Sequence, residues 1–110
     1  MTNNNKPTKT LNESFNETSL KRGQVFMIEL DENPSTGHRW EFQVKNGKVQ
    51  KIDDIFTSLA RPNTVGGIGK RRMIYKSFGR KEIVIEAKYK RAWEKQKDAA
   101  GALTFKVKLK

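Results

Sequence analysis

Apolar and polar residues alternate with a period of two along much of the chain, which is the pattern of half-buried β-strands. The clearest case is residues 39–45, where Trp40, Phe42 and Val44 alternate with polar or charged neighbours. The same alternation recurs over 83–89 and 103–109, while apolar residues crowd both faces of 24–30. Further strands are expected over 72–78 and within 10–21, and no segment keeps a helical period over ten residues. The pattern therefore predicts an all-β protein.

Turn residues separate these strands at regular intervals. Asn46-Gly47 predicts a tight hairpin between 39–45 and a short return strand over 48–52, and Gly79-Arg80-Lys81 predicts the next turn. We expect a looser connection over 53–63, with room for one helical turn at 55–59. About seven to eight short antiparallel strands with such spacing indicate an immunoglobulin-like β-sandwich.

Loops of unusual composition are expected at one end of this sandwich. Successive strands run in opposite directions, so alternate connections emerge at the same end. The turns at 46–47 and 79–81 fall at one end, and the loops around 31–38, 61–71 and 91–101 fall at the other. Three long loops at one tip are typical of a binding site, although long loops are also simply tolerated at protein surfaces.

The composition is consistent with a single domain in a reducing compartment. The 110 residues suit one domain, which we assign to 11–110 behind a flexible polar tail of 1–10. The chain has no cysteine, so disulfides and thiolate chemistry are excluded. Neither a signal-peptide apolar segment nor a stretch long enough to span a membrane is present. We therefore expect a cytoplasmic protein with no membrane partner.

The formal net charge of +11 is unevenly distributed. Basic and acidic residues balance over 1–60, so the whole positive excess lies in the second half of the chain. Such a positive surface speeds encounters with an acidic partner. Nucleic acid and an acidic protein are the two classes of partner that this asymmetry suggests.

The first of the three loops is Asn33-Pro34-Ser35-Thr36-Gly37. Pro34 fixes its own φ, Asn33 is suited to bond the backbone two residues on, and Gly37 permits a positive φ. The loop is therefore expected to be rigid before it meets a partner, with Thr36 at its crest offering a hydroxyl and an amide. An ordinary proline turn is the alternative explanation.

The second loop contains Val65, Gly66, Gly67, Ile68 and Gly69. It lacks the first glycine and the final Ser/Thr of a phosphate-binding P-loop, and it leads into a strand instead of a helix. The glycines leave a bare backbone that another chain can approach closely, with Ile68 as an anchor. A plain flexible loop explains the composition equally well.

The third loop carries Arg91, Ala92 and Trp93 beyond the strand that ends near Tyr89. Arg and Trp are among the residues most enriched in the energetic centres of protein interfaces. A lone Trp is often packed beneath its own loop, but beside two other unusual loops we expect Trp93 to be exposed.

Residues for catalysis or metal binding are scarce. His38 is the only histidine, and Ser35 lies too close to it in sequence to form a triad without a third partner. Asp53-Asp54 is interpreted as a solvated turn. We therefore expect neither an enzyme nor a metal or cofactor site.

The three loops together resemble the chagasin family of cysteine-protease inhibitors. That family carries an NPTTG loop, a glycine-rich loop and a Y-x-R-P-W loop in this order, and the resemblance extends from about Leu11 to the C-terminus. Ala92 replaces the proline of the third motif, which reduces its rigidity, and Ser35 replaces a threonine. The basic run Lys70-Arg71-Arg72 is outside the signature and is expected to be a solvated strand start or, alternatively, a steering charge.

The resemblance implies a reversible, competitive inhibitor whose loops plug the active-site cleft of papain-like proteases of the cathepsin L or B type. The first loop would lie nearest the catalytic residues through Thr36, the glycine-rich loop along the substrate side, and Arg91 and Trp93 on the primed side. A monomer with no nucleic-acid partner is expected. The runner-up is a basic β domain that binds nucleic acid or an acidic protein.

Overall fold

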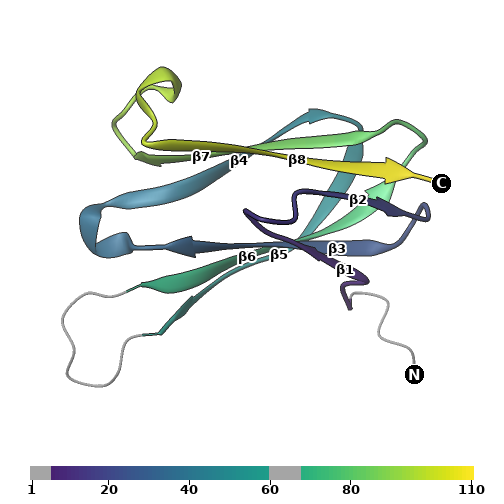
Figure 1. Ribbon diagram of the computed structural model, residues 1–110, viewed down its shortest axis with the longest axis horizontal. Helices are drawn as coiled ribbons and strands as arrows, with labels where there is room; N and C mark the ends of the chain where they lie inside the picture. Colours follow the sequence, from purple (N-terminus) through teal and green to yellow (C-terminus); the bar gives the residue numbers. More distant parts are fainter. Residues whose placement is uncertain (1–5, 60–67) are drawn as a thin grey trace.

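The protein is a sandwich of two four-stranded β-sheets (Figure 1), as the computed structural model shows for residues 6–59 and 68–110. One sheet has the order β1-β3-β6-β5 and the other the order β2-β8-β7-β4. The strands are β1 (Lys9–Leu11), β2 (Glu17–Leu20), β3 (Val25–Glu32), β4 (His38–Asn46), β5 (Lys48–Ser58), β6 (Gly69–Phe78), β7 (Ile83–Arg91) and β8 (Gly101–Leu109), with 3-10 turns η1 (Pro34–Thr36) and η2 (Gln96–Asp98). The all-β prediction and the sandwich architecture are confirmed.

The alternating apolar residues of the central strands form the core between the sheets. Phe26 and Ile28 of β3 meet Ile83 and Ile85 of β7 in one buried cluster, which also contains Phe105. Each of these five side chains is at most 1% exposed, and burial of such side chains is worth about 1.5–3 kcal/mol each. The faces of β7 and β8 predicted from the alternation are therefore buried, whereas on β4 Trp40 and Phe42 are only partly buried and Val44 is 41% exposed.

The two N-terminal strands correct the expectation of a wholly antiparallel arrangement. β1 pairs with β3 and β2 pairs with β8, both in parallel. The chain lays one short strand along an edge of each sheet before it enters β3, so each of the two runs beside a strand that is distant in sequence. β1 begins at Lys9, two residues before the expected start of the domain at Leu11.

The connection at Asn46-Gly47 is not the predicted hairpin, because β4 and β5 belong to different sheets. Gly47 has a φ of +82°, and a Cβ there would lie 2.8 Å from the carbonyl oxygen of Glu82. The side-chain amide of Asn46 donates a hydrogen bond of 2.7 Å to the same carbonyl. Asn46-Gly47 therefore turns the chain from one sheet into the other. The sequence predicts a turn here, but it does not predict that the next strand pairs in the opposite sheet.

Strand β5 is longer than predicted. It continues from Lys48 to Ser58, so the expected loose connection and helical turn are wrong over 53–58. A register shift between Lys51 and Asp53 explains the error, because one extra residue reverses the apolar alternation. Asp54 does not belong to a solvated turn either: its carboxylate accepts a 2.7 Å hydrogen bond from Arg71.

A buried carboxylate joins the two sheets near the end of β3. Glu32 is 1% exposed and accepts hydrogen bonds from the Arg71 guanidinium at 2.5 Å and from the Trp40 backbone amide at 2.8 Å. Burial opposes the charge of Arg71, but its hydrogen bonds to Glu32 and Asp54 outweigh this and raise the pKa of the guanidinium. The network connects β3, β5 and β6 of one sheet with β4 of the other.

Glu32→Ala is expected to lower the free energy of unfolding by about 3 kcal/mol, because it leaves a largely buried Arg71 and the Trp40 amide without this partner. Urea denaturation followed by tryptophan fluorescence measures the change.

Glu29→Ala is the matched control on the same strand. Glu29 pairs with Arg72 at 2.7 Å, but both side chains are about a third exposed, so its loss is expected to cost about 1 kcal/mol or less. Equal losses in the two variants would contradict the special role of the buried network.

Candidate functional site

Two described connections, and the ends of β5 and β6, lie at one end of the sandwich, at the left of Figure 1. The first, residues 33–37, joins β3 to β4 and crosses between the sheets, and the third, residues 92–100, joins β7 to β8 within one sheet. β5 ends and β6 begins at the same end, where the Leu59 amide donates to the carbonyl of Ile68 at 3.1 Å. The predicted placement of the first and third loops at one tip is thus confirmed, and the described ends of β5 and β6 lie there too; residues 60–67 between them lie outside the described residues.

The first loop is locked by its own side chains. The Asn33 carboxamide oxygen accepts hydrogen bonds from the Ser35 amide at 3.2 Å and from the Ser35 hydroxyl at 2.5 Å. The Thr36 hydroxyl is 3.0 Å from the Asn33 carbonyl oxygen, and Gly37 ends the turn with a φ of +81°. With Pro34 in its first turn, the loop has few alternative conformations, as the sequence predicted.

The base of this loop is fastened to both sheets. The Trp40 indole NH donates to the Asp31 carbonyl at 2.8 Å, beside the bond from the Trp40 amide to Glu32. Across the sandwich, the Asn33 amide donates to the Tyr89 hydroxyl of β7 at 2.9 Å. The loop therefore projects from a rigid platform.

The third loop is folded around Glu94. The Glu94 carboxylate accepts the Arg91 amide at 2.7 Å, and the Glu94 carbonyl accepts the ammonium of Lys90 at 2.8 Å. Lys90 is only 6% exposed and also pairs with Glu41 of β4 at 2.6 Å. Trp93, by contrast, is 76% exposed, so it does not pack beneath its own loop.

Direct contacts make the first and third loops one surface. The Arg91 side chain donates to the Thr36 carbonyl at 3.2 Å, and its guanidinium lies 5.9 Å from the centre of the Trp93 ring. His38 stacks on Tyr89 with ring centres 5.1 Å apart. Its Nδ1 is 2.9 Å from the Thr36 hydroxyl and its Nε2 is 4.0 Å from Glu94.

His38, Lys90 and Glu94 therefore support the site, although none was predicted to do so. Glu94 lies three residues after Arg91, a spacing that suits a carboxylate closing a turn, and this signal was available in the sequence. Nothing local to Lys90 indicates burial, because a lysine at a strand end is normally solvated.

Only part of the second loop can be placed. Val65, Gly66 and Gly67 lie outside the described residues. Ile68 is 54% exposed at the tip. Gly69, in contrast, is buried at the first position of β6. A Cβ on Gly69 would lie 2.3 Å from the Phe56 ring. Packing therefore requires this glycine, and the structure does not bring it to the predicted contact surface.

The basic run Lys70-Arg71-Arg72 lies at the start of β6, where Lys70 and Arg72 are about a third exposed and only Arg71 is largely buried. Its members pair in turn with Asp31, Glu32 and Glu29 of β3. The hydrogen bond to Asp31 raises the pKa of Lys70. These three charges therefore form ion pairs between the neighbouring strands β6 and β3.

No constellation for chemistry is found in the described part of the chain. The Ser35 hydroxyl bonds Asn33 and not His38. No group of three or more His, Cys, Asp or Glu side chains in residues 6–59 and 68–110 is placed to hold a metal ion. The site is a rigid surface formed by the first and third loops, with Thr36, Arg91, Ala92 and Trp93 on its outer side.

Comparisons with known proteins identify relatives of this arrangement. Residues 19–109 match the model of the chagasin family peptidase inhibitor I42. Amoebiasin-2 of Entamoeba histolytica is 29% identical over 99 residues, which cover 89% of this chain and 75% of that protein.

Solved structures of similar fold include the cysteine protease inhibitor EhICP2 from Entamoeba histolytica, with a TM-score of 0.76 and 24% identity over 96% of this chain and 100% of that one. Amebosin has a TM-score of 0.66 and 24% identity, with 96% and 100% of the two chains covered. PbICP-C, solved in complex with falcipain-2, has a TM-score of 0.59 and 17% identity, with 96% and 92% covered.

Lys90→Met is expected to loosen the third loop, because the Glu94 carbonyl loses a charged hydrogen bond worth about 1.5–3 kcal/mol. Native-state hydrogen exchange should show the Glu94 amide, which bonds the Arg91 carbonyl, exchanging at least about tenfold faster.

Lys88→Met is the control on the same strand, since the Lys88 ammonium is 3.4 Å from the Gln96 carbonyl and 3.9 Å from Glu86. Unchanged exchange at Glu94 in Lys90→Met would show that the buried ammonium does not hold the loop.

Proposed function

Since the chain belongs to the chagasin family of peptidase inhibitors, we propose that it blocks papain-like cysteine proteases by inserting its three-loop tip into the active-site cleft. The protein is an inhibitor and not an enzyme. The observation that carries the proposal is the rigid joint surface of the first and third loops. There Arg91 links Thr36 to a Trp93 that is 76% exposed.

The first loop is suited to enter a proteolytic cleft without being cleaved. Proteases hold their substrates as extended strands, whereas residues 34–36 form a 3-10 turn tied back to Asn33. Thr36 at the crest faces the catalytic pair in this proposal, and Gly37 returns the chain to β4. Inhibition is therefore competitive and reversible, because the loop offers no peptide bond in the geometry that a nucleophile attacks.

The other two loops flank this wedge. Arg91, Ala92 and Trp93 contact the primed side of the cleft, and the segment Val65, Gly66, Gly67 and Ile68 contacts the substrate side through its backbone. Ala92 stands where the family motif has proline, but the bonds from Arg91 and Lys90 to Glu94 supply the lost rigidity. This preorganisation reduces the entropy lost on binding.

The proposed targets are enzymes of the cathepsin L or B type, met in the cytoplasm by a monomeric inhibitor. The complex of PbICP-C with falcipain-2 supports a protease as partner, since that protein shares this fold. Compartment and target follow from the family resemblance and the composition.

Titration of the purified protein into papain or a cathepsin L-type enzyme tests the function, with hydrolysis of a fluorogenic peptide as the readout. Stoichiometric loss of activity at nanomolar inhibitor, reversed on dilution and little changed by salt, is expected. Full protease activity at micromolar protein would refute the proposal.

Trp93→Ala is expected to weaken inhibition by about 2 kcal/mol or more, roughly thirtyfold in the inhibition constant, because an exposed Trp anchor loses its buried contact in the complex. Stability should be nearly unchanged, since the indole is exposed in the free protein.

Substitutions in the first loop provide a graded comparison. Thr36→Ala should cost less than Trp93→Ala, and Thr36→Glu should cost more, because a bulky charge would enter the cleft. Phe78→Ala is the control, as Phe78 is 39% exposed but is the last residue of β6, a strand that begins at the end with the three loops. Equal effects of Phe78→Ala and Trp93→Ala would contradict the assigned surface.

A further inference from the structure

The end of the sandwich opposite the three loops carries a group of exposed cations. They come from the connection 21–24, from the crossing at Gly47, from the connection 79–82 and from the C-terminus, and they are Arg22, Lys48, Arg80, Lys81 and Lys110. Within residues 6–59 and 68–110 none of the five forms an ion pair. They differ in this respect from the basic run of β6, although Glu82 in the connection 79–82 adds one negative charge. We call them the distal cations.

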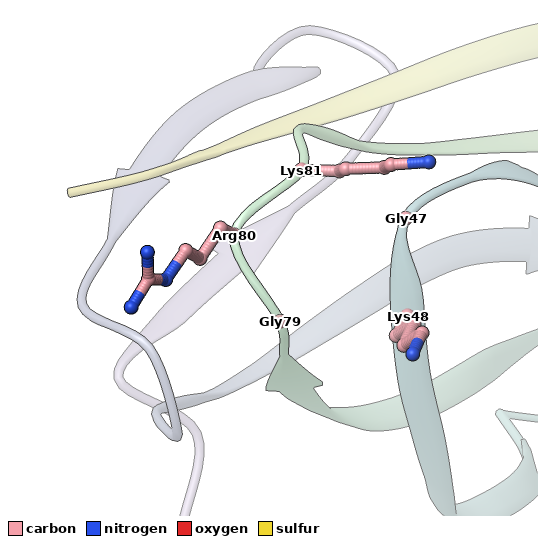
Figure 2. A pocket seen from close by; sticks show the side chains of 5 residues that line it. All are labelled: Gly47, Lys48, Gly79, Arg80 and Lys81. Carbon is pink, nitrogen blue, oxygen red and sulfur yellow. The ribbon is translucent and has the colours of Figure 1, made fainter.

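Two adjoining hollows run between the distal cations. One, of about 300 Å³, is lined by Gly47, Lys48, Gly79, Arg80 and Lys81 (Figure 2). The other, of about 270 Å³, is lined by Arg22, Gly79, Arg80, Leu109 and Lys110. Both hollows are lined by Gly79 and Arg80, so they adjoin at these two residues, and we call them together the distal groove.

The cations are spread along this groove and do not converge on one point. Figure 2 shows the Arg80 and Lys81 side chains pointing away from each other, with Lys48 on the neighbouring strand. Such spacing does not suit a single small anion. It suits an extended chain with a negative charge on each unit.

An aromatic side chain lies beside the groove. Phe78 is 39% exposed and is the register partner of Lys48, so the two side chains project from the same face of the antiparallel β5–β6 pair. The Lys76 ammonium lies 5.7 Å from the Phe78 ring. An exposed ring flanked by cations is the combination on which single-stranded nucleic acids stack their bases.

We propose that the distal groove binds single-stranded nucleic acid. The distal cations neutralise successive phosphates, and the ring of Phe78 stacks on one base. The connections that line the groove lie at the end of the sandwich opposite the inhibitory loops (Figure 1), so this proposal allows both partners to bind at once. This activity is independent of protease inhibition.

Fluorescence anisotropy of a labelled oligothymidylate of about 12 nucleotides tests the proposal. Neutralisation of about four phosphates predicts an affinity that falls roughly 50-fold between about 50 and about 200 mM salt. Absence of binding at micromolar protein in low salt would overturn the proposal. Protease inhibition is measured in parallel on each variant to show that the fold is intact.

The double variant Arg80→Glu, Lys81→Glu is expected to weaken oligonucleotide binding at least about tenfold. Its matched control is Lys106→Glu, Lys108→Glu, which makes the same change in net charge on exposed lysines of β8. Equal loss in the two double variants would show attraction by net charge only and would overturn the site.

Phe78→Ala separates base recognition from charge alone, with an expected loss of about fivefold or more if a base stacks on the ring. Inorganic polyphosphate and anionic phosphatidylserine vesicles are the alternative ligands. Tighter binding to either of them than to the oligonucleotide, together with no effect of Phe78→Ala, would assign the groove to a phosphate chain or a membrane surface and refute the nucleic-acid proposal.

Discussion

The bond network of Glu32 is the constraint on which the working end of this protein depends. A carboxylate that is almost fully buried needs hydrogen-bond donors for its oxygens, and the donors to Glu32 come from both sheets. Arg71 fixes β3 against β6, and the Trp40 amide fixes the start of β4. The first loop spans the interval between Glu32 and Trp40, so its two ends are set at one separation. The buried pair therefore contributes geometry as well as stability.

Hydrogen bonds and ion pairs hold the loops at this end in fixed conformations, a role that disulfides have in many small domains. The chain has no cysteine, yet the first and third loops are each closed by hydrogen bonds to a single residue, Asn33 or Glu94. Lys90 and Tyr89 then tie these loops to the strands beneath them. The joint surface of the first and third loops is rigid because the polar groups of each loop already have hydrogen-bond partners within the protein.

The sequence predicted those features that depend on local patterns. Alternation identified the buried faces of β7 and β8, and the composition of residues 33–37 identified a stiff turn. The errors arose where a distant residue decides the outcome. Asn46-Gly47 indicates a turn but not which sheet follows it, and the extra residue near Asp53 reverses the alternation of β5. The partners of Arg71 and the burial of Lys90 follow from strand register, which a single sequence does not contain.

The three loops are attached to the sandwich in different ways. The first crosses from one sheet to the other, while β5 and β6 form a hairpin in one sheet and β7 and β8 a hairpin in the other. The central wedge is thus common to both halves of the molecule, and each flank belongs to one half alone. A lineage can lengthen or recode one hairpin without moving the wedge or the opposite flank. The two sides of a target's cleft are therefore free to be matched separately, one hairpin at a time.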